Sequence, residues 1–390
     1  MKTGNGIPFV DLVTPHLELE EELLEASRRV FTTGMFIGGP MVEQFEREFA
    51  KFCDAKFCIG VSSGTDALRF ALMAAGIGNG DIVVTVPNTF VATVEAILQA
   101  GAKPHFVDVD PRTFNMSVDA LREYLRKNGS NKVKAVLPVH LYGQMCDMDG
   151  LRKVADEHGL MIFEDACQAH GSEYLSVTHN RWLKAGSVGK AAAFSFYPGK
   201  NLGACGEAGA VTTNDETIAQ RIRMIRDHGQ NKKYHHLLEG YNGRLDALQA
   251  ALLLVKLPHL DGWNSKRREA AQNYNRRLAG VDAIVTPPEP EWSRSVYHLY
   301  VVRAQNRDEL QQHFQENGVS TGLHYPIPVH LQSAYAHLGF RKGDFPHSEL
   351  ASKQILSLPM YPHLAAHHQD HIVDTLLEFY ESRTVQTGTI

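Results

Sequence analysis

The chain has 390 residues, of which 43% are hydrophobic and 21% charged, and its formal net charge at pH 7 is -5. This composition is ordinary for a globular enzyme of more than one domain, and the acidic balance gives no basic footprint for nucleic acid. We expect a cytoplasmic protein without membrane contact, because no apolar segment approaches the roughly 20 residues that span a bilayer, no signal peptide is apparent, and the cysteines form no CxxC pair.

Strand and helix patterns alternate along the first two thirds of the chain. After two helices of an N-terminal arm, at 17–30 and 42–52, the pattern predicts strands at 57–61, 82–86, 104–109, 133–139, 161–164, 192–196 and 208–213. It predicts intervening helices at 91–98, 118–125, 151–157 and 216–226. Such alternation favours a mostly parallel sheet with helices on both faces.

The pattern changes beyond residue 243. A long helix is predicted over 245–278, followed by a strand at 297–304 and helices at 308–316 and 370–382. The sequence Pro287-Pro288-Glu289-Pro290 marks a boundary between these parts. We therefore predict an α/β protein with a large domain and arm at 1–243, a linking helix at 244–280, and a smaller α+β domain at 281–390.

Lys200 stands where an apolar strand ends in the Pro-Gly turn of Phe196-Tyr197-Pro198-Gly199-Lys200. An amine held near an apolar wall has a lowered pKa and is nucleophilic toward carbonyls. Asp165 ends the strand upstream, where a carboxylate could hold a protonated pyridine ring. Each residue alone has an ordinary explanation, as a surface lysine or a helix cap. The two together indicate a Schiff-base lysine and its acidic partner.

Two strand-to-helix junctions add candidate ligands. In Ser62-Ser63-Gly64-Thr65-Asp66, helix N-terminal N–H groups and small residues suit an anion, so Gly64 and Thr65 are predicted to bind phosphate, with Ser195 adding a hydroxyl. Phe90 follows another strand and is predicted to stack on a flat ring in the cleft at the strand ends. A helix cap and a core phenylalanine are the alternatives for each motif alone. No Walker lysine follows, which disfavours a nucleoside triphosphate.

Seven ordered motifs carry a resemblance to a known family. Besides those above, they include Glu164-Asp165-Ala166-Cys167-Gln168-Ala169-His170-Gly171, His228-Gly229-Gln230, Gly240-Tyr241-Asn242-Gly243-Arg244-Leu245-Asp246 and His324-Tyr325-Pro326-Ile327-Pro328. With them the chain resembles the DegT/DnrJ/StrS nucleotide-sugar aminotransferases, which are fold-type I pyridoxal-phosphate enzymes. The resemblance covers nearly the whole chain.

The resemblance implies a role for each candidate residue. Lys200 and Asp165 would be catalytic, the first by forming the Schiff base and moving the substrate proton, the second by pairing with the pyridine nitrogen. The other ligands of pyridoxal phosphate would be Gly64, Thr65, Phe90, Gln168, Ser195 and Asn242. Gln168 would contact the phenolic oxygen, and Asn242 would reach the phosphate in the neighbouring subunit. The implied assembly is a homodimer with shared active sites.

The resemblance also implies the substrates. Arg244, His324 and Tyr325 match positions that contact a nucleotide sugar, although a structural role remains open for all three. The implied reaction moves an amino group from glutamate to a nucleotide-linked keto sugar, in polysaccharide or antibiotic biosynthesis. The Lys200 segment resembles members that aminate carbon 3, which favours a 3-keto-6-deoxyhexose on dTDP or a UDP-2-acetamido-3-keto sugar.

Two alternatives remain open at this point. A 4-keto substrate is the first, although members acting there more often carry His-Pro before the lysine. A ligand-sensing regulator on the same scaffold is less favoured, because no DNA-binding segment precedes residue 60 and no basic patch is evident. The segment 174–190 is longer than usual and could alter substrate access. His367, His368 and His371 fit a solvated helix start better than a metal site, so no metal is expected.

Overall fold

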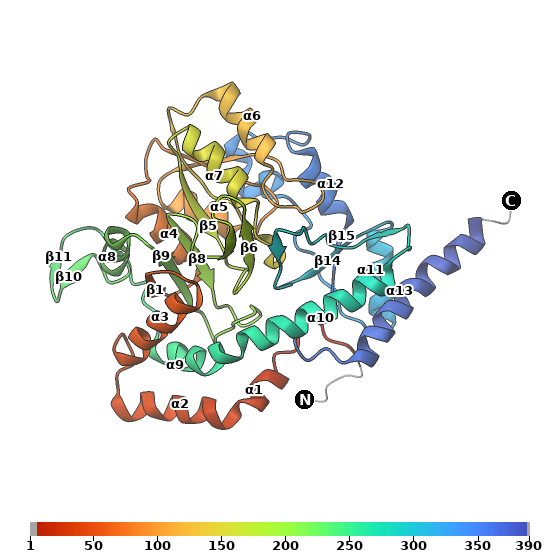
Figure 1. Cartoon of the computed structure of the whole chain (residues 1–390), viewed down its shortest axis with the longest axis horizontal. Helices are drawn as coiled ribbons and strands as arrows, with labels where there is room; N and C mark the ends of the chain where they lie inside the picture. Colours follow the sequence, from red (N-terminus) through yellow and green to blue (C-terminus); the bar gives the residue numbers. More distant parts are fainter. Residues whose placement is uncertain (1–5, 388–390) are drawn as a thin grey trace.

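The computed structural model describes residues 6–387 and is built around a seven-stranded sheet (Figure 1). In spatial order the strands are β1 (Phe57–Val61), β9 (Gly209–Thr213), β8 (Ala191–Ser195), β5 (Met161–Asp165), β4 (Val133–Val136), β2 (Ile82–Thr85) and β3 (Lys103–Phe106). All neighbours pair in parallel except β9, which is antiparallel to β1 and β8. The prediction of a mostly parallel sheet is confirmed.

The single antiparallel strand has a local cause. A parallel return needs a crossover, usually through a helix. The connection from β8 to β9 contains no helix and instead carries Lys200. Strand β9 therefore returns beside β8 in the opposite direction, and Lys200 stays at the carboxyl end of β8.

Helices cover both faces of the sheet. Consecutive strand residues point to opposite faces, so Ile162 and Phe163 enter different cores. Phe163 packs with α4 (Gly64–Ala74), α5 (Ala92–Gln99) and α8 (Glu216–Ile225). The core around Ile162 is covered by α3 (Pro40–Phe52), α6 (Val118–Asn128), α7 (Met148–Glu157) and α9 (Ala247–Lys256).

The helix predicted over 245–278 is interrupted. Helix α9 is followed by the 3-10 turn η2 (Leu257–His259) and then by α10 (Leu260–Leu278). Pro258 lies in that turn, where proline has no N–H for the helical bond to the preceding turn. The N-terminal arm is also split, into α1 (Thr14–Glu18) and α2 (Glu20–Thr33), and α2 lies along α9 (Figure 1).

A second, smaller core forms near the C-terminus. The antiparallel strands β12 (Ile284–Val285), β14 (Tyr300–Ala304) and β15 (Ile355–Leu358) pack with α10, α11 (Arg307–Glu316) and α13 (Ala366–Thr387). The strand predicted from residue 297 begins three residues later, because Tyr297 has a positive φ of 41°. Ile7 pairs with Val319, so the chain's beginning joins this unit. The division at 243/244 and 280/281 stays a prediction.

Several short elements were not predicted. The segment 174–190 contains a hairpin of β6 (Glu173–Ser176) and β7 (Arg181–Lys184), extended by β13 (Ser293–Arg294). Residues 177–179 lie between the two hairpin strands. The polar stretch 227–243 holds the hairpin β10 (Gln230–Lys232) and β11 (His235–His236). The remaining elements are η1 (Leu141–Gly143), η3 (Val329–Leu331), η4 (Ser333–Leu338) and α12 (Pro346–Gln354).

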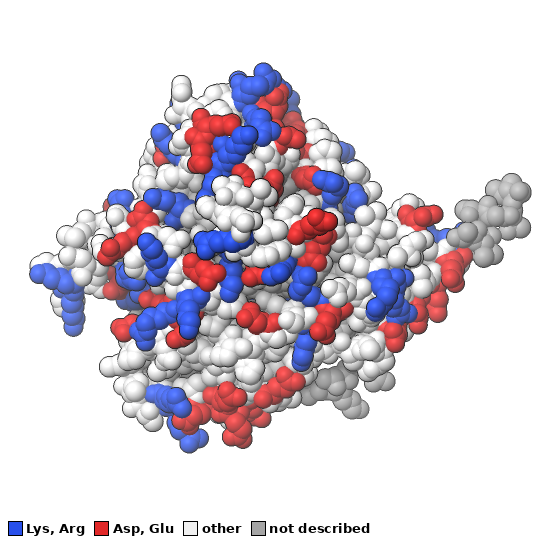
Figure 2. All heavy atoms as spheres, viewed as in Figure 1, with Lys and Arg blue, Asp and Glu red and all other residues white. Residues whose placement is uncertain are grey.

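The segment with η3 and η4 returns from the C-terminal unit to the large sheet. Val329, Tyr335 and Phe345 pack against Val94 of α5 and Phe106 of β3. This contact places the chain just after His324 and Tyr325 near the edge of the large domain. On the face in Figure 2, positive and negative side chains are interspersed, with acidic groups along α2. None of the described helices is long and apolar enough to cross a membrane.

Candidate active site

Lys200 lies in a tight turn after β8. Its N–H donates to the Tyr197 carbonyl at 2.8 Å, and Ala204 N donates to the Phe196 carbonyl at 2.7 Å, which closes the loop around the lysine. The side chain is half-buried. Burial lowers the pKa of the Lys200 amine, while the nearby thiol of Cys167 and carboxyl of Asp165 act to raise it. The net lowering increases the share of neutral, nucleophilic amine.

Asp165 is buried at the carboxyl end of β5, adjacent to β8. Thr93 Oγ1 donates to Asp165 Oδ2 at 2.7 Å, and Thr89 Oγ1 lies 2.7 Å from Thr93 Oγ1. Cys167 N donates to Asp165 Oδ1 at 3.3 Å. Neither threonine was predicted as a site residue, although both stand in the junction that contains Phe90. Their hydroxyls fix the orientation of the carboxylate.

Gly64 and Ser195 meet at the N-terminus of α4. A Cβ added at Gly64 would lie 2.6 Å from Ser195 Cβ, so only glycine allows this approach. Ser63 caps the helix and takes the N–H groups of Asp66 and Ala67. Within residues 6–387, the backbone N–H groups of Gly64 and Thr65 in the first turn of α4 donate no hydrogen bond. Free donors beside a serine hydroxyl form an anion cradle.

Gln168, Tyr325 and Phe90 form a connected group on the other side. Gln168 Nε2 donates to the Tyr325 hydroxyl at 3.2 Å, and its Oε1 accepts from Tyr142 N at 2.8 Å. The rings of Phe90 and Tyr325 have centroids 5.7 Å apart. Phe90 is 53% exposed, which leaves its ring available for stacking.

His324 joins this group from the C-terminal unit. Its Nδ1 lies 2.9 Å from Ser357 Oγ, its ring stacks on Phe9 at 5.4 Å, and its carbonyl accepts from the Tyr142 hydroxyl. Burial lowers the pKa of His324 to about 4, and the charge of Lys200 adds to the effect. The imidazole is therefore neutral near pH 7. The hydrogen bond from Tyr142, whose N–H is bonded to Gln168, places His324 in the same site.

The side chains of Asn242 and Arg244 bond to each other and to Asp227. Arg244 Nη1 donates to Asp227 Oδ1 at 2.6 Å, and Nη2 donates to Asn242 Oδ1 at 2.7 Å. Asn242 is exposed. The backbone of Arg244 bridges to Val61 at the end of β1. In the described part of the chain, the recorded side-chain bonds of this pair connect it to Asp227 rather than to Lys200 or Asp165.

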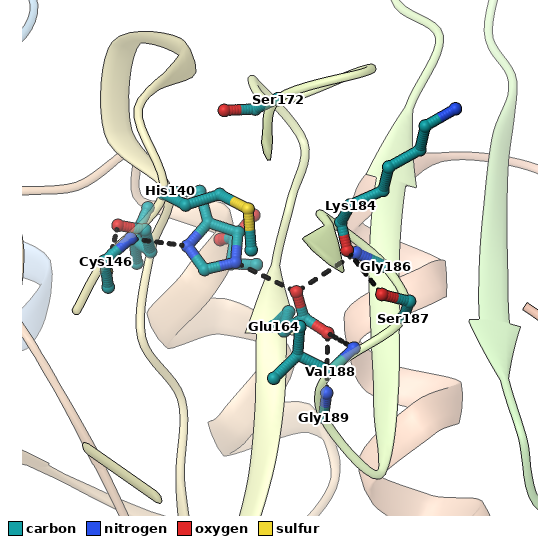
Figure 3. Close-up of polar contacts among 12 residues, drawn as sticks. His140, Cys146, Glu164, Ser172, Lys184, Gly186, Ser187, Val188 and Gly189 are labelled. Carbon is teal, nitrogen blue, oxygen red and sulfur yellow. Dashed lines mark hydrogen bonds and ion pairs between the residues drawn. The ribbon is translucent and has the colours of Figure 1, made fainter. Parts of the chain in front are cut away.

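A buried polar network supports the end of β5 from the opposite face (Figure 3). Glu164 accepts from the N–H groups of Gly186, Val188 and Gly189 at 2.7–3.0 Å, and its Oε2 lies 3.0 Å from His140 Nε2. Cys146 N donates to His140 Nδ1 at 3.2 Å, so Nδ1 accepts and Nε2 donates to Glu164.

This network links the two strands that carry the candidate catalytic residues. Burial acts to raise the pKa of the Glu164 carboxyl, but His140 and the backbone donors outweigh it and the pKa is lowered. The backbone N–H of His140 also donates to the backbone carbonyl of Asp165 at 3.0 Å. Glu164 thereby ties β5 to the loop that leads into β8. Its neighbour Asp165 was predicted from the sequence, whereas this role of Glu164 was not.

Residues 17–377 match the model of the DegT/DnrJ/EryC1/StrS aminotransferase family. The chain belongs to this family. The resemblance inferred from the motifs is thus confirmed, and with it the α/β fold of an aminotransferase.

Curated and solved proteins of the DegT family are similar to this chain over most of their length. The "Erythromycin biosynthesis sensory transduction protein EryC1" of Saccharopolyspora erythraea is 45% identical, over 95% of this chain and 98% of that protein. The "dTDP-3-amino-3,4,6-trideoxy-alpha-D-glucose transaminase" of Streptomyces venezuelae is 43% identical, over 96% of each chain. The crystal structure of S. venezuelae DesV in complex with a ketimine intermediate has a TM-score of 0.91 and 42% identity, covering 96% of this chain and 98% of that one.

The residues present fit the cofactor of the DegT family, pyridoxal phosphate, which a solved neighbour at 31% identity holds in its pyridoxamine form. The anion cradle at Gly64 suits a phosphate, and the buried carboxylate of Asp165 suits a protonated ring nitrogen. The protein is accordingly a pyridoxal-phosphate-dependent aminotransferase. The assignment of roles to individual residues stays a prediction.

Proposed function

We propose that the protein moves an amino group from glutamate to carbon 3 of a nucleotide-linked keto sugar. The observation that carries the proposal is the position of Lys200 just after β8, beside the strand that ends in the buried Asp165. The bound cofactor supplies an electron sink that stores the amino group between the two half-reactions. Its phosphate is held by Gly64, Thr65 and Ser195.

The remaining residues orient the reactants and move protons. Lys200 transfers a proton to and from the substrate carbon. Asp165 keeps a proton on the ring nitrogen, and Gln168 holds the oxygen beside the reacting carbon. Phe90 covers the ring face and excludes water from it. Tyr325, which contacts Gln168 and Phe90, and the adjacent His324 bind the sugar. The simplest test is whether the purified protein is yellow and loses that colour when L-glutamate is added.

The substrate class rests on the relatives and on the lysine segment. A relative at 43% identity is described as a transaminase of a dTDP-3-amino sugar. The residues flanking Lys200 set how the sugar lies over the ring, and so which carbon meets the amine. We infer a 3-keto-6-deoxyhexose on dTDP or a UDP-2-acetamido-3-keto sugar. The free state of the described cysteines agrees with a reducing cytoplasm as the site of the reaction.

Matched 3-keto and 4-keto nucleotide sugars test the position of the ketone. We expect the 3-keto compound to be aminated with a kcat/KM roughly 100-fold higher, because a displacement of about 1 Å at the reacting carbon has an effect of that size. NMR of the product identifies the aminated carbon. Efficient amination of the 4-keto sugar, with every 3-keto compound refused, would establish the alternative substrate.

A regulatory role is the second candidate, because the relative at 45% identity is described as a sensory transduction protein. The two functions differ in one measurable property. A sensor needs to bind the ligand, whereas an aminotransferase must release amino sugar in multiple turnovers. Product formation well above the enzyme concentration, abolished when Lys200 is removed, decides for the enzyme.

We further propose a homodimer in which Asn242 and Arg244 complete the partner's site. Within one chain the side-chain hydrogen bonds of both residues go to each other and to Asp227, and Asn242 is exposed. The arm also carries a row of exposed apolar side chains, which is typical of an interface. These are Leu24, Phe31, Met35, Phe36 and Ile37.

Mixed dimers test the shared site. We expect Lys200→Ala and the double variant Asn242→Ala/Arg244→Ala to be inactive separately. After they are mixed and allowed to exchange subunits, about a quarter of the parental activity should return, because half of the dimers are hybrids with one intact site. Lys200→Ala mixed with itself is the control. A monomer that sediments as a single chain and retains full activity rules the shared site out.

A further inference from the structure

The carboxylate of Glu164 faces away from the candidate active site. Successive residues of a strand point to opposite faces of the sheet, so Glu164 and Asp165 cannot both reach the cofactor. Glu164 is 1% exposed, and four N–H donors surround its two oxygens, as a buried anion requires. A well-packed apolar pair is often as stable as a buried polar one, because taking a charge out of water has a large cost. Stability is therefore a weak reason for this anion.

The segment 138–142 runs beside the end of β5 and bonds to two predicted ligands of the cofactor. It accepts the N–H of Asp165 at 2.9 Å and donates to the Asp165 carbonyl at 3.0 Å. Its last residue, Tyr142, donates from N to Gln168 Oε1 at 2.8 Å. The position of this segment therefore sets where the carboxyl of Asp165 and the amide of Gln168 lie.

His140 anchors this segment through its ring. Cys146 N donates to Nδ1, which leaves the ring proton on Nε2, where it is donated to Glu164 Oε2 at 3.0 Å. Glu164 in turn accepts three N–H groups of the loop 186–189, which precedes β8. The His140–Glu164 pair thus joins the segment 138–142, β5 and this loop on the face opposite the site (Figure 3).

We propose that the His140–Glu164 pair positions the cofactor ring by fixing the segment 138–142. Through this segment the pair keeps Asp165 at the ring nitrogen and Gln168 at the phenolic oxygen. One rigid ring meets both side chains only if their spacing is fixed, and a displacement of about 1 Å reduces turnover on the order of 10²-fold. The proposal rests on the proposed function, because it takes from it the roles of Asp165 and Gln168.

Glu164→Gln in the purified holoenzyme tests the proposal. Glutamine keeps the size of the side chain, but its NH₂ group meets the N–H of His140 or of the loop 186–189, and two donors repel each other. We expect kcat to fall by roughly 10- to 100-fold and KM to change by less than about threefold. Visible circular dichroism of the bound cofactor, which reports the orientation of its ring, should change as well.

The pH profile gives a second signature of the same change. The carboxylate of Asp165 raises the pKa of the ring nitrogen, so a less well aligned carboxylate raises it less. The ring then loses its proton at lower pH. The alkaline limb of the kcat profile of Glu164→Gln should therefore move to lower pH, by up to about one unit. A purely structural role would lower the melting temperature and leave this limb in place.

Glu349→Gln is the matched control. Glu349 is also buried and lies 3.1 Å from the ring of a buried histidine, His330, but this pair joins η3 to α12. Its loss should lower the melting temperature and leave the kcat, the alkaline limb and the circular dichroism unchanged. A folded Glu164→Gln protein with parental values of all three overturns the proposal. Equal impairment by Glu349→Gln also overturns it, since the effect then follows stability.

Two variants of His140 decide the question if Glu164→Gln does not fold. His140→Gln places an amide oxygen and an NH₂ group at about the spacing of the two ring nitrogens, so both hydrogen bonds persist and kcat should stay within about threefold of the parent. His140→Leu fills the space without either bond and should behave like Glu164→Gln. Parental behaviour of His140→Leu overturns the proposal, and so does a His140→Gln protein that is impaired as strongly as His140→Leu.

The proposed function has a separate criterion. If L-glutamate leaves the colour of the parent unchanged, the choice of donor fails, whereas the circular dichroism of the bound cofactor still reports the position of the ring. If the parent turns over and the variants keep its circular dichroism and its pH profile, the positioning role fails and the proposed function stands.

Discussion

Replacing Lys200 by alanine is expected to abolish amino transfer, with a loss on the order of 10⁴-fold or more in kcat. The loss should be so large because one amine serves as both the attachment point of the cofactor and the carrier of the substrate proton. Burial lowers the pKa of this amine, so it is partly neutral where an ordinary surface lysine is charged. Lys190→Ala is the matched control, because Lys190 stands at the opposite end of β8 and pairs with Asp215 near the surface.

The assignment of Lys200 has an independent chemical readout. Borohydride reduction of the yellow enzyme should attach the cofactor irreversibly to a peptide that contains Lys200, and the Lys200→Ala protein should lack the corresponding absorbance. Lys256 is the informative competitor, since it and Lys200 line one small cavity. An adduct mapped to Lys256, or to another lysine, shows that the assignment is wrong.

Much of the large domain was predictable because its signals are local. Buried parallel strands are short apolar runs, and the strands at 57–61 and 161–164 were placed within one residue of β1 and β5. The cofactor motifs were also predictable, because each follows a strand and the carboxyl ends of parallel strands share one edge. The separate motifs at Gly64, Asp165 and Lys200 therefore converge.

The contacts that tune the site are not local and could not be predicted. Thr93 and Asp165 lie 72 positions apart, and His140 and Glu164 lie 24 apart. Threonine and histidine are common in such segments, so nothing in the sequence distinguishes these.

Irregular elements explain the errors in the C-terminal part. The sequence pattern of 245–278 is helical on both sides of Pro258. It therefore predicted one continuous helix where the structure has two, α9 and α10. The hairpins in 174–190 and 227–243 are made of very short, largely polar strands that have little apolar alternation to detect. The segment with η3 and η4 is predicted only if its distant partners, Val94 and Phe106, are known.

The second large expected effect concerns Asp165. Asp165→Ala should still bind the cofactor through the cradle at Gly64 and through Lys200, and should remain yellow. An opposite charge shifts a pKa by roughly one to three units, so removing the carboxylate should reduce the protonated fraction of the ring, and turnover with it, by about 10- to 1,000-fold. The measurement is kcat together with the pH dependence of the absorbance.

A graded series separates the charge of Asp165 from its orientation. Asp165→Asn removes the charge but keeps the shape, and we expect it to be nearly as impaired as alanine. Thr93→Val keeps the charge but deletes the 2.7 Å hydrogen bond, which corresponds to about 1 kcal/mol or a several-fold loss. The expected order of activity is therefore parent, Thr93→Val, then both Asp165 variants. Near-parental turnover in Asp165→Ala would show that this carboxylate has no role in the mechanism. No other acid among residues 6–387 accepts a hydrogen bond from Thr93, so none could take its place at the end of β5.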